Sequence, residues 1–231
     1  MHPNIILIET STSLCSVAMV KGGELSARRF SSEPRAHAAM TAVYVKEVLE
    51  ECGLKVSNCD AVCLSMGPGS YTGLRVGSST AKGLCFGGGI PLLAVSTLDV
   101  LVAQAQASGL PDGCRYIVPM IDARRMEVYS AVYSAEGEKL TEVAPIVVED
   151  LGSVVRPLEI SDGILFIGDG VSKCEEVLAG EGRWFRQECP RADSMVAPAM
   201  REYAARNFRD TAYFEPFYLK DFIATKPKQL F

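Results

Sequence analysis

The chain has 231 residues, of which 48% are hydrophobic and 22% charged, and these proportions are ordinary for a soluble globular protein. Its formal net charge is −5, so the chain as a whole should repel a phosphate backbone, and any RNA that it handles would have to be held mainly by another subunit. Its apolar stretches fall far short of the roughly 20 residues of a membrane span, and its start has no basic segment typical of a cleaved signal, so we expect a cytoplasmic protein without membrane contact.

The first half of the chain predicts three strands followed by alternating helices and strands. Ile5–Ile8 is a continuous apolar run, typical of a strand buried on both faces, and it ends in the polar turn Glu9–Ser13. The chain then returns as two further strands joined by a hairpin turn at Lys21–Glu24. The remaining elements expected here are helices over residues 37–52, 72–86 and 98–107 and strands over residues 61–65 and 91–95.

The opening pattern appears a second time after a cluster of turn residues. That cluster, Ser108–Gly113, is the densest near the middle of the chain, and we interpret it as the boundary between two lobes. Ile117–Ile121 then leads to Asp122, as Ile5–Ile8 leads to Glu9, and a strand is expected over residues 126–134.

Each half also has a buried strand that ends in Gly-x-Gly, at Gly67–Gly69 and at Gly168–Gly170, and a last helix is expected over residues 194–208. The sequence therefore predicts the α/β class, with β-β-β-α-β units in tandem. We expect an N-terminal lobe over residues 1–108, a C-terminal lobe over residues 109–231, and a cleft lined by the acidic turns and the Gly-x-Gly loops. Coincidence between generic strand–turn–strand segments is the alternative.

The cysteines predict neither a zinc site nor a disulfide framework. No two are spaced C-x-x-C, and most stand inside apolar runs, so we expect small buried side chains in a reducing compartment. The eight positions are Cys15, Cys52, Cys59, Cys63, Cys85, Cys114, Cys174 and Cys189.

The acidic turn after the first strand is a weak candidate for a phosphate site. A strand, an acidic turn and a returning hairpin resemble the phosphate-handling start of the actin, sugar-kinase and Hsp70 superfamily. There, main-chain N–H groups and hydroxyls surround phosphate while a carboxylate holds Mg²⁺ through water. The candidates are Glu9, Thr10 and Ser11. Glu9 stands where aspartate is more usual, and its longer side chain would displace a metal.

The loop Gly67–Gly73 is a second weak anion candidate, because free N–H groups at the start of a helix favour negative charge. It matches neither familiar glycine pattern: Leu74 follows where a P-loop needs lysine, and Thr72 stands where the dinucleotide pattern needs glycine. A tight turn that lets the helix approach the sheet explains the glycines equally well. The candidate residues here are Gly67, Gly69 and Ser70.

The helix after this loop carries small residues every four positions, at Gly73, Gly77 and Ala81. Such a ridge admits another backbone, either from the chain's own core or from a second protein. The preceding helix has more apolar residues than one inward stripe requires, and we therefore favour a second protein. The expected interface residues are Met40, Tyr44, Val48, Gly73, Arg75, Gly77 and Ala81.

Several of these segments together resemble the TsaB (YeaZ) family. The resemblance is strong over about residues 5–133, and its most specific part is the glycine–tyrosine loop with its helix. Beyond that it thins to Gly168–Gly170 and Pro216–Leu219. The segments that carry it are Ile8–Thr12, Cys15–Ala18, Arg35–His37, Gly67–Arg75, Ala81–Gly83 and Asp122–Tyr129.

The resemblance implies tandem ribonuclease-H-like lobes of the actin, sugar-kinase and Hsp70 (ASKHA) type, with mixed sheets flanked by helices. It also implies a role in making N6-threonylcarbamoyladenosine (t6A) at adenosine 37 of tRNAs that read codons starting with A. In that family the transfer chemistry belongs to the related subunit TsaD, with which TsaB dimerises, and the ATPase TsaE joins the pair.

The resemblance further implies a homodimer through the two N-terminal helices when the chain is alone. tRNA is then met only through the complex. No cofactor is expected in the isolated chain, and ATP or ADP would be bound, if at all, at the complex with TsaD and TsaE.

The histidine content argues against catalysis by this chain. TsaD-type proteins carry a histidine metal motif after the Gly-Pro-Gly loop and its helix, whereas residues 94–100 contain none, and His2 and His37 are the only histidines in the chain. We therefore expect no catalytic residue and no metal site. His37 opens a helix, and we expect a capping or structural role for it.

Three rival functions stay open on the sequence alone. A small-molecule kinase or ATPase of the ASKHA fold would use Glu9 and Asp122 across the cleft, but no general base, lysine clamp or Walker element stands out. A metalloprotease would need the missing histidines. A scaffold role in a different complex would be distinguished by the proteins that co-purify with the chain.

Two basic features have no assigned role. Arg124 and Arg125 follow the acidic strand end, where they would contact an anion or form ordinary surface ion pairs. Lys220, Lys226 and Lys228 make a basic C-terminal tail that is either solvated or in contact with tRNA or the partner.

Overall fold

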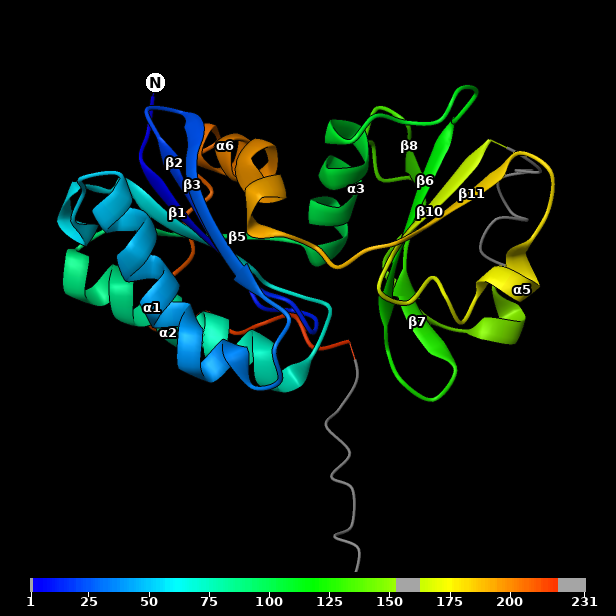
Figure 1. The fold of residues 1–231 in the computed structure, drawn as a ribbon, viewed down its shortest axis with the longest axis horizontal. Helices are drawn as coiled ribbons and strands as arrows, with labels where there is room; N and C mark the ends of the chain where they lie inside the picture. The colour runs from blue at the N-terminus through cyan, green and yellow to red at the C-terminus, as the bar shows by residue number, and fades with distance from the viewer. Residues whose placement is uncertain (1, 153–162, 220–231) are drawn as a thin grey trace, which may run out of the picture.

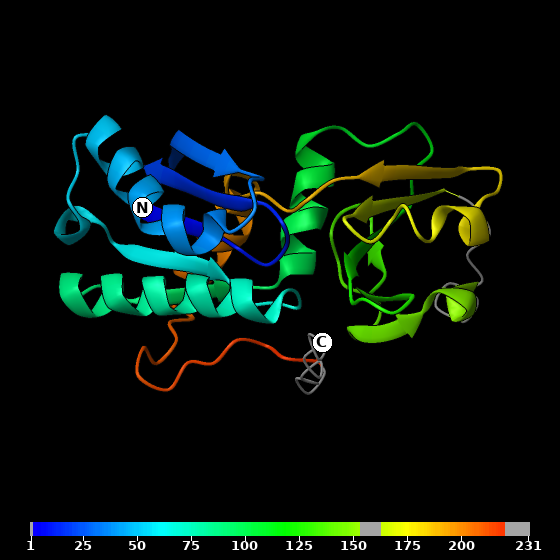
Figure 2. The same cartoon turned by 60° about the horizontal axis from the view of Figure 1, so that its bottom comes forward.

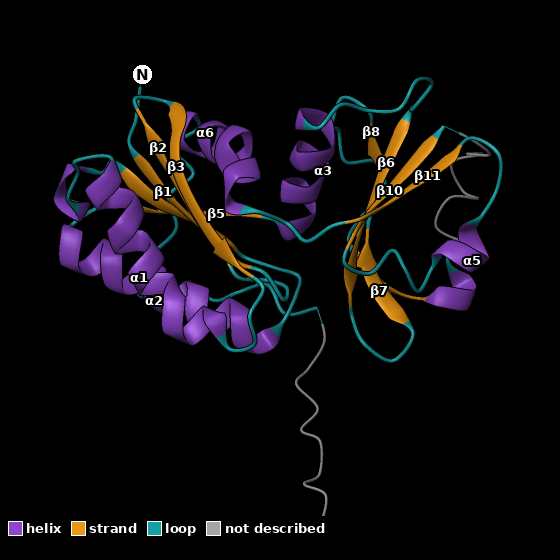
Figure 3. Cartoon of the chain, in the orientation of Figure 1, coloured by secondary structure: helices purple, strands orange, loops and turns teal. Residues whose placement is uncertain are grey.

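The structure, a computed structural model, describes residues 2–152 and 163–219 and contains two β-sheets with helices on their faces (Figures 1 and 3). This confirms the predicted α/β class with mixed sheets flanked by helices. The three lysines of the basic C-terminal tail lie outside the described residues.

The first sheet is built from the strands of the first half of the chain, in the order β3-β2-β1-β4-β5. β1 pairs antiparallel with β2 and parallel with β4, and β4 pairs parallel with β5. The strands are β1 (Ile5–Glu9), β2 (Cys15–Lys21), β3 (Glu24–Ser31), β4 (Ala61–Ser65) and β5 (Leu92–Val95).

The second sheet has the order β11-β10-β6-β7-β9, with β8 paired to β6. β6 pairs antiparallel with β7 and parallel with β10, so it repeats the pairing of β1 with β2 and β4. The strands are β6 (Tyr116–Asp122), β7 (Glu127–Ser130), β8 (Tyr133–Ser134), β9 (Ala144–Val147), β10 (Ile164–Gly168) and β11 (Arg183–Gln187).

The helices of the first half of the chain follow the predicted order with small shifts at their ends, whereas the four-residue helix α5 was not predicted. The α-helices are α1 (Ala36–Glu51), α2 (Tyr71–Gly88), α3 (Thr97–Ala107), α5 (Glu175–Leu178) and α6 (Val196–Ala204). Short 3₁₀ turns are η1 (Val56–Asn58), η2 (Val148–Asp150) and η4 (Ala192–Met195). None of the helices in the described part of the chain is long and apolar enough to cross a membrane.

Two predicted elements differ from the structure. The strand expected over residues 126–134 is broken, because β7 pairs with the end of β6 and β8 with its beginning. The helix expected over residues 194–208 begins as the 3₁₀ turn η4 and ends at Ala204. Arg206, two residues later, has a positive φ of 53°, which is incompatible with a right-handed helix.

The apolar run of β1 is buried on both faces, as predicted. Ile6 and Ile8 pack into the core beneath α1 and α2, whereas Ile5 and Leu7 pack into the core on the opposite face. β10 alternates in the same way between two cores of the second sheet. Alternation along one strand thus explains why these segments read as continuous hydrophobic sequence.

Two helices connect the sheets by packing away from their neighbours in sequence. Leu98, Leu101 and Ala105 of α3 join the core of the second sheet, although β5 of the first sheet immediately precedes them. Ala199 of α6 joins the core of the first sheet together with Met195. Figure 1 shows α3 and α6 side by side between the sheets. The division at residues 108–109 stays a prediction.

All eight cysteines are free. Six are buried and two, Cys114 and Cys189, are half-buried, which agrees with the prediction of small apolar side chains. Burial raises the pKa of the Cys59 thiol to about 11, so this thiol is held in its unreactive neutral form.

Candidate functional site

The two weak anion candidates, the turn after β1 and the loop before α2, lie against each other. The Ser70 N–H donates to the Ser11 carbonyl at 2.6 Å, and the Thr10 hydroxyl donates to the Gly73 carbonyl at 2.8 Å. A Cβ on Gly69 would stand 2.3 Å from the Ser11 carbonyl oxygen. The loop therefore needs glycine because its backbone touches the turn.

The two loops therefore bond to each other, and the anion interpretation of these residues stays a prediction. The Ser11 N–H donates to a Glu9 carboxylate oxygen at 2.6 Å, and the Gly73 N–H donates to the Ser70 hydroxyl, which caps α2. Gly67 faces the Phe217 carbonyl, 2.7 Å from where a Cβ would stand. The structure does bring all six candidates together, namely Glu9, Thr10, Ser11, Gly67, Gly69 and Ser70.

Glu9 is fully buried, which contradicts its expected place on the wall of a cleft. One carboxylate oxygen accepts the Ser11 N–H, and the other has no hydrogen-bond partner. Burial raises the pKa of Glu9 to about 7, although the hydrogen bond from the Ser11 N–H opposes the rise. A carboxyl group that is partly protonated at neutral pH and shielded from solvent is poorly suited to hold Mg²⁺.

The corresponding acidic turn of the second sheet is exposed and differently paired. The Asp122 carboxylate accepts the Arg124 N–H at 2.7 Å and forms an ion pair with Lys173. Partial burial alone would raise the pKa of Asp122, but these contacts hold it below its usual value. Asp169 accepts the Asp122 N–H at 2.9 Å, and its own burial raises its pKa to about 6.

Three consecutive residues at the β6–β7 turn have left-handed backbone. Arg124, Arg125 and Met126 have φ angles of 63°, 48° and 57°. Such a conformation costs a non-glycine residue roughly 1–2 kcal/mol. All three side chains are exposed. The sequence placed a turn here but could not predict this conformation, because none of the three is a residue that favours it.

Four of the seven expected interface residues lie inside the chain's own core. Val48 and Ala81 are fully buried, and a Cβ on Gly73 or Gly77 would stand 2.0 or 2.3 Å from an atom of Thr10. The interpretation of the small-residue ridge as a docking surface for a second protein is therefore wrong. The ridge admits the chain's own turn after β1.

The other three candidates remain accessible. Met40 and Tyr44 are half-buried on α1, and the exposed Arg75 lies over the ring of Tyr71, 4.4 Å from its centre. Two apolar side chains of the same helix pair are more exposed, Val43 at 40% and Phe86 at 90%. His37 lies in the first turn of α1 without capping it, and its Nε2 is buried without a hydrogen-bond partner.

A segment near the C-terminus, residues 209–219, runs along α2, and we call it the strap (Figure 2). Lys82 donates to the carbonyls of Ala212 and Phe214, both at 3.0 Å. The strap's far end meets the loop before α2, where the rings of Tyr218 and Tyr71 lie 5.0 Å apart. This contact was not predicted from the sequence, which shows only the family-like segment Pro216–Leu219.

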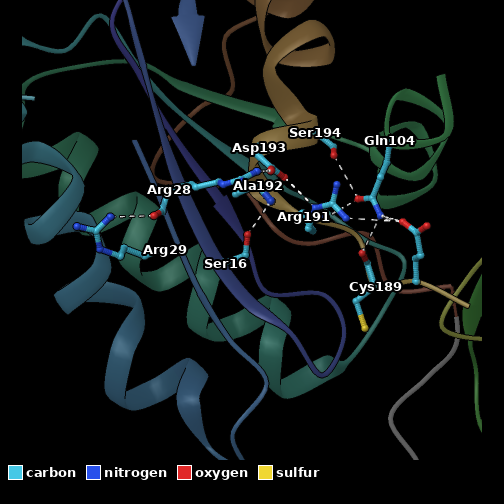
Figure 4. A network of polar contacts seen from close by, with 10 residues as sticks. Ser16, Arg28, Arg29, Gln104, Cys189, Arg191, Ala192, Asp193 and Ser194 are labelled. Atoms are coloured by element: carbon cyan, nitrogen blue, oxygen red, sulfur yellow. Dashed lines mark hydrogen bonds and ion pairs between the residues drawn. The ribbon is translucent and has the colours of Figure 1, made fainter. Parts of the chain in front are cut away.

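A buried glutamine on α3 fastens the chain where it returns from the second sheet to the first (Figure 4). The Gln104 amide nitrogen donates to Glu188 at 2.7 Å and to the Cys189 carbonyl at 3.1 Å. Its oxygen accepts the Arg191 N–H at 3.1 Å. The next residue, Ala192, donates its N–H to the Ser16 hydroxyl on β2, so the segment joins both sheets.

Two open hollows lie elsewhere. One of about 490 Å³ lies beneath the strap, beside Met66 and Phe217. The larger, of about 750 Å³, lies beside Gly113 and Trp184 at the start of β6. Neither is lined by Glu9, Asp122 or the Gly-x-Gly loops.

Comparison with known proteins identifies the family of this chain. The family model described as TsaD, tRNA N6-adenosine threonylcarbamoyltransferase, matches residues 31–225. The TsaB protein of Escherichia coli is 30% identical over 96% of this chain and 96% of its own length. The chain belongs to the TsaB family. Its members carry the name of tRNA threonylcarbamoyladenosine biosynthesis proteins, not of transferases.

Further members of the TsaB family match in the same way. The Bacillus subtilis TsaB protein is 30% identical over 77% of this chain and 78% of its own length. The structure of YeaZ from Pseudomonas aeruginosa has a TM-score of 0.82 and 28% identity, and the match covers 94% of this chain and all of that chain.

A more distant similarity shows the fold alone. An activator of 2-hydroxyisocaproyl-CoA dehydratase from Clostridium difficile, solved with bound ADPNP, has a TM-score of 0.50 at 8% identity. The match covers 90% of this chain and 98% of that chain. The fold of this TsaB family member is therefore of the ASKHA type, as predicted.

Proposed function

We propose that this chain is a non-catalytic scaffold subunit for the threonylcarbamoylation of adenosine 37 in tRNAs that read codons starting with A. Membership of the TsaB family supports the pathway. One structural observation above all supports the absence of a catalytic role. The two loops that would hold phosphate are hydrogen-bonded to each other, and Glu9 is buried beneath them. The transfer chemistry then belongs to a TsaD-like subunit.

The exposed surface of α1 and α2 is the proposed contact for that subunit. Val43 and Phe86 present apolar area, and Met40, Tyr44 and Arg75 are accessible around it. Exposed apolar side chains together with tyrosine and arginine are typical of protein interfaces. In the absence of the partner, the same surface would form a homodimer. A TsaE-like ATPase would join the pair in the cytoplasm and bring ATP or ADP to the complex.

The experiment has a genetic and a biochemical part. Deleting the gene should remove t6A from the host's tRNA, measured by mass spectrometry of tRNA hydrolysates, and the wild-type chain should restore it. The tagged chain should capture a TsaD-like and a TsaE-like protein. Turnover of ATP by the chain alone, or normal t6A in the deletion strain, would contradict the proposal.

Matched variants test the surface itself. Val43→Glu with Phe86→Glu should lower capture of the TsaD-like subunit at least 10-fold, because both charges would have to be desolvated in the interface. Val177→Glu is the control, since Val177 is 49% exposed on α5 of the second sheet, away from these helices. Equal capture by all three proteins would place the partner elsewhere.

A further inference from the structure

The β6–β7 turn presents two arginines under an unusual constraint. Arg124, Arg125 and Met126 all have left-handed φ angles, a conformation that glycine or asparagine adopts more readily. Backbone strain of this kind persists where surrounding contacts hold it, and it concentrates at binding and catalytic sites. Glycine at any of the three positions would relieve this backbone strain, yet all three residues have long, exposed side chains.

Inward-facing contacts hold the turn. The Arg124 N–H donates to Asp122, and the Glu127 N–H donates to the Arg124 carbonyl at 3.0 Å. Asp122 is in turn fixed by Lys173 and by the carboxylate of Asp169. The Asp122 carboxylate is thus already paired with Lys173. In contrast, no ion pair joins Arg124 or Arg125 to another described residue.

The turn lies at the same end of the molecule as the turn after β1 and the far end of the strap, the lower end in Figure 1. There the first sheet contributes Arg75, which lies over Tyr71, and Tyr71 in turn contacts Tyr218. Guanidinium groups from both sheets and aromatic rings therefore gather at one end of a chain whose net charge is −5.

We propose that this end of the chain, through Arg124 and Arg125 first, binds phosphate groups of RNA in the assembled complex. The inference rests on the proposed function, which supplies tRNA as the substrate. Arginine presents a planar fork of donors that matches phosphate. An arginine laid on a tyrosine ring is an arrangement on which unpaired bases stack. An acidic protein surface is the rival occupant, and capture of the TsaD-like subunit without RNA separates the two.

The test removes the two charges and keeps the backbone. Asparagine tolerates left-handed φ, so Arg124→Asn with Arg125→Asn should leave the turn folded. Binding of tRNA to the complex with the TsaD-like and TsaE-like subunits is measured from 50 to 200 mM KCl. The slope of log K against log salt is negative, and each lost phosphate contact lowers its magnitude by about 1. We expect a decrease of about 1–2 for the double variant.

The control removes the same charge at the other end. Arg201 and Arg206 are exposed at the end of α6, near the amino end of β5, where Leu92 pairs with Arg209. Arg201→Asn with Arg206→Asn should leave the slope unchanged, and Arg206 also has a positive φ, so the backbone change is matched at that position. An equal decrease in both double variants would overturn the proposal, because net charge alone would explain it.

Other outcomes are equally decisive. Arg124→Lys with Arg125→Lys should keep the slope, and if the asparagine pair does not fold, Arg125→Asn alone should lower it by about 1. If the asparagine pair instead weakens capture of the TsaD-like subunit without RNA, the turn is a protein contact and the RNA proposal fails. A wild-type chain that captures neither subunit would refute the proposed function itself, which is a separate result.

Discussion

Glu9 is a carboxyl group whose burial makes the stability of the chain depend on pH. Its pKa rises from 4.5 to about 7 on folding, so between these values the folded chain holds a proton that the unfolded chain has released. The free energy of unfolding therefore falls as pH rises through this window. At about 1.4 kcal/mol per pKa unit, the loss at pH 8 is on the order of 3 kcal/mol.

Glu9→Gln should remove this dependence, because glutamine keeps an acceptor for the Ser11 N–H but cannot ionise. We expect the variant to be more stable than wild type at pH 8 and similar to it at pH 5, measured by urea unfolding. Asp169 has the same sign between pH 3.8 and about 6, but it is present in both proteins and cancels in the comparison. Glu24→Gln, on the exposed start of β3, is the control. A wild-type-to-variant difference that is equal at both pH values would refute the assignment.

The glycines of α2 have opposite effects on stability at different positions. Gly73 meets the Thr10 carbonyl, whereas Gly83 has no heavy atom within 4 Å of where its Cβ would stand. Gly73→Ala should therefore destabilise the chain by roughly 1–3 kcal/mol or more, because the obstacle is backbone and cannot rotate away. Gly83→Ala should stabilise it by about 0.5–1 kcal/mol through helix propensity.

Thermal and urea unfolding of the two single variants measures both effects. They change the same residue type in the same helix, so each serves as the control for the other. Destabilisation by both would mean that the exposed side of α2 is covered by another copy of the chain. Stabilisation by both would mean that the turn after β1 does not touch the helix.

The same helix shows how far the sequence could predict this protein. Strand and helix order followed from period and turn residues, because burial on two faces dictates a run such as Ile5–Ile8. A ridge at Gly73, Gly77 and Ala81 equally fits an internal or an external neighbour, since spacing describes the helix and not what lies against it. The neighbour is Thr10, 63 residues before Gly73, and local pattern contains no such information.

The candidate site was predictable only in part for the same reason. Sequence placed Glu9 at the end of a buried strand, but whether its side chain points to solvent or beneath the loop depends on how β1 and β4 pair. The left-handed turn at Arg124 was not predictable, since it depends on hydrogen bonds within the turn and on contacts with segments distant in sequence, such as those that Asp122 makes with Asp169.

At the scale of the whole molecule, the two sheets are connected through helices that pack away from their sequence neighbours. α3 follows β5 but packs on the second sheet, and α6 follows β11 but packs on the first. The chain therefore crosses twice, and the second crossing runs past Gln104 on α3. Because Gln104 on α3 forms hydrogen bonds with the chain as it returns to the first sheet, we expect this residue to hold the two halves in one arrangement.

Gln104→Leu should test this, because leucine is of similar size but leaves the Cys189 carbonyl and the Arg191 N–H without that partner. Each buried group left unpaired costs about 1–3 kcal/mol, so we expect a loss of roughly 2–5 kcal/mol in urea unfolding. Amide exchange at residues 188–194 should accelerate, because the segment would lose the contacts that anchor it on α3. Gln106→Leu is the matched control, since Gln106 is exposed on the same helix and bonds only to the Ala135 carbonyl. Equal losses in both variants, or unchanged exchange in Gln104→Leu, would show that apolar packing of α3 and α6 alone fixes the two sheets relative to each other.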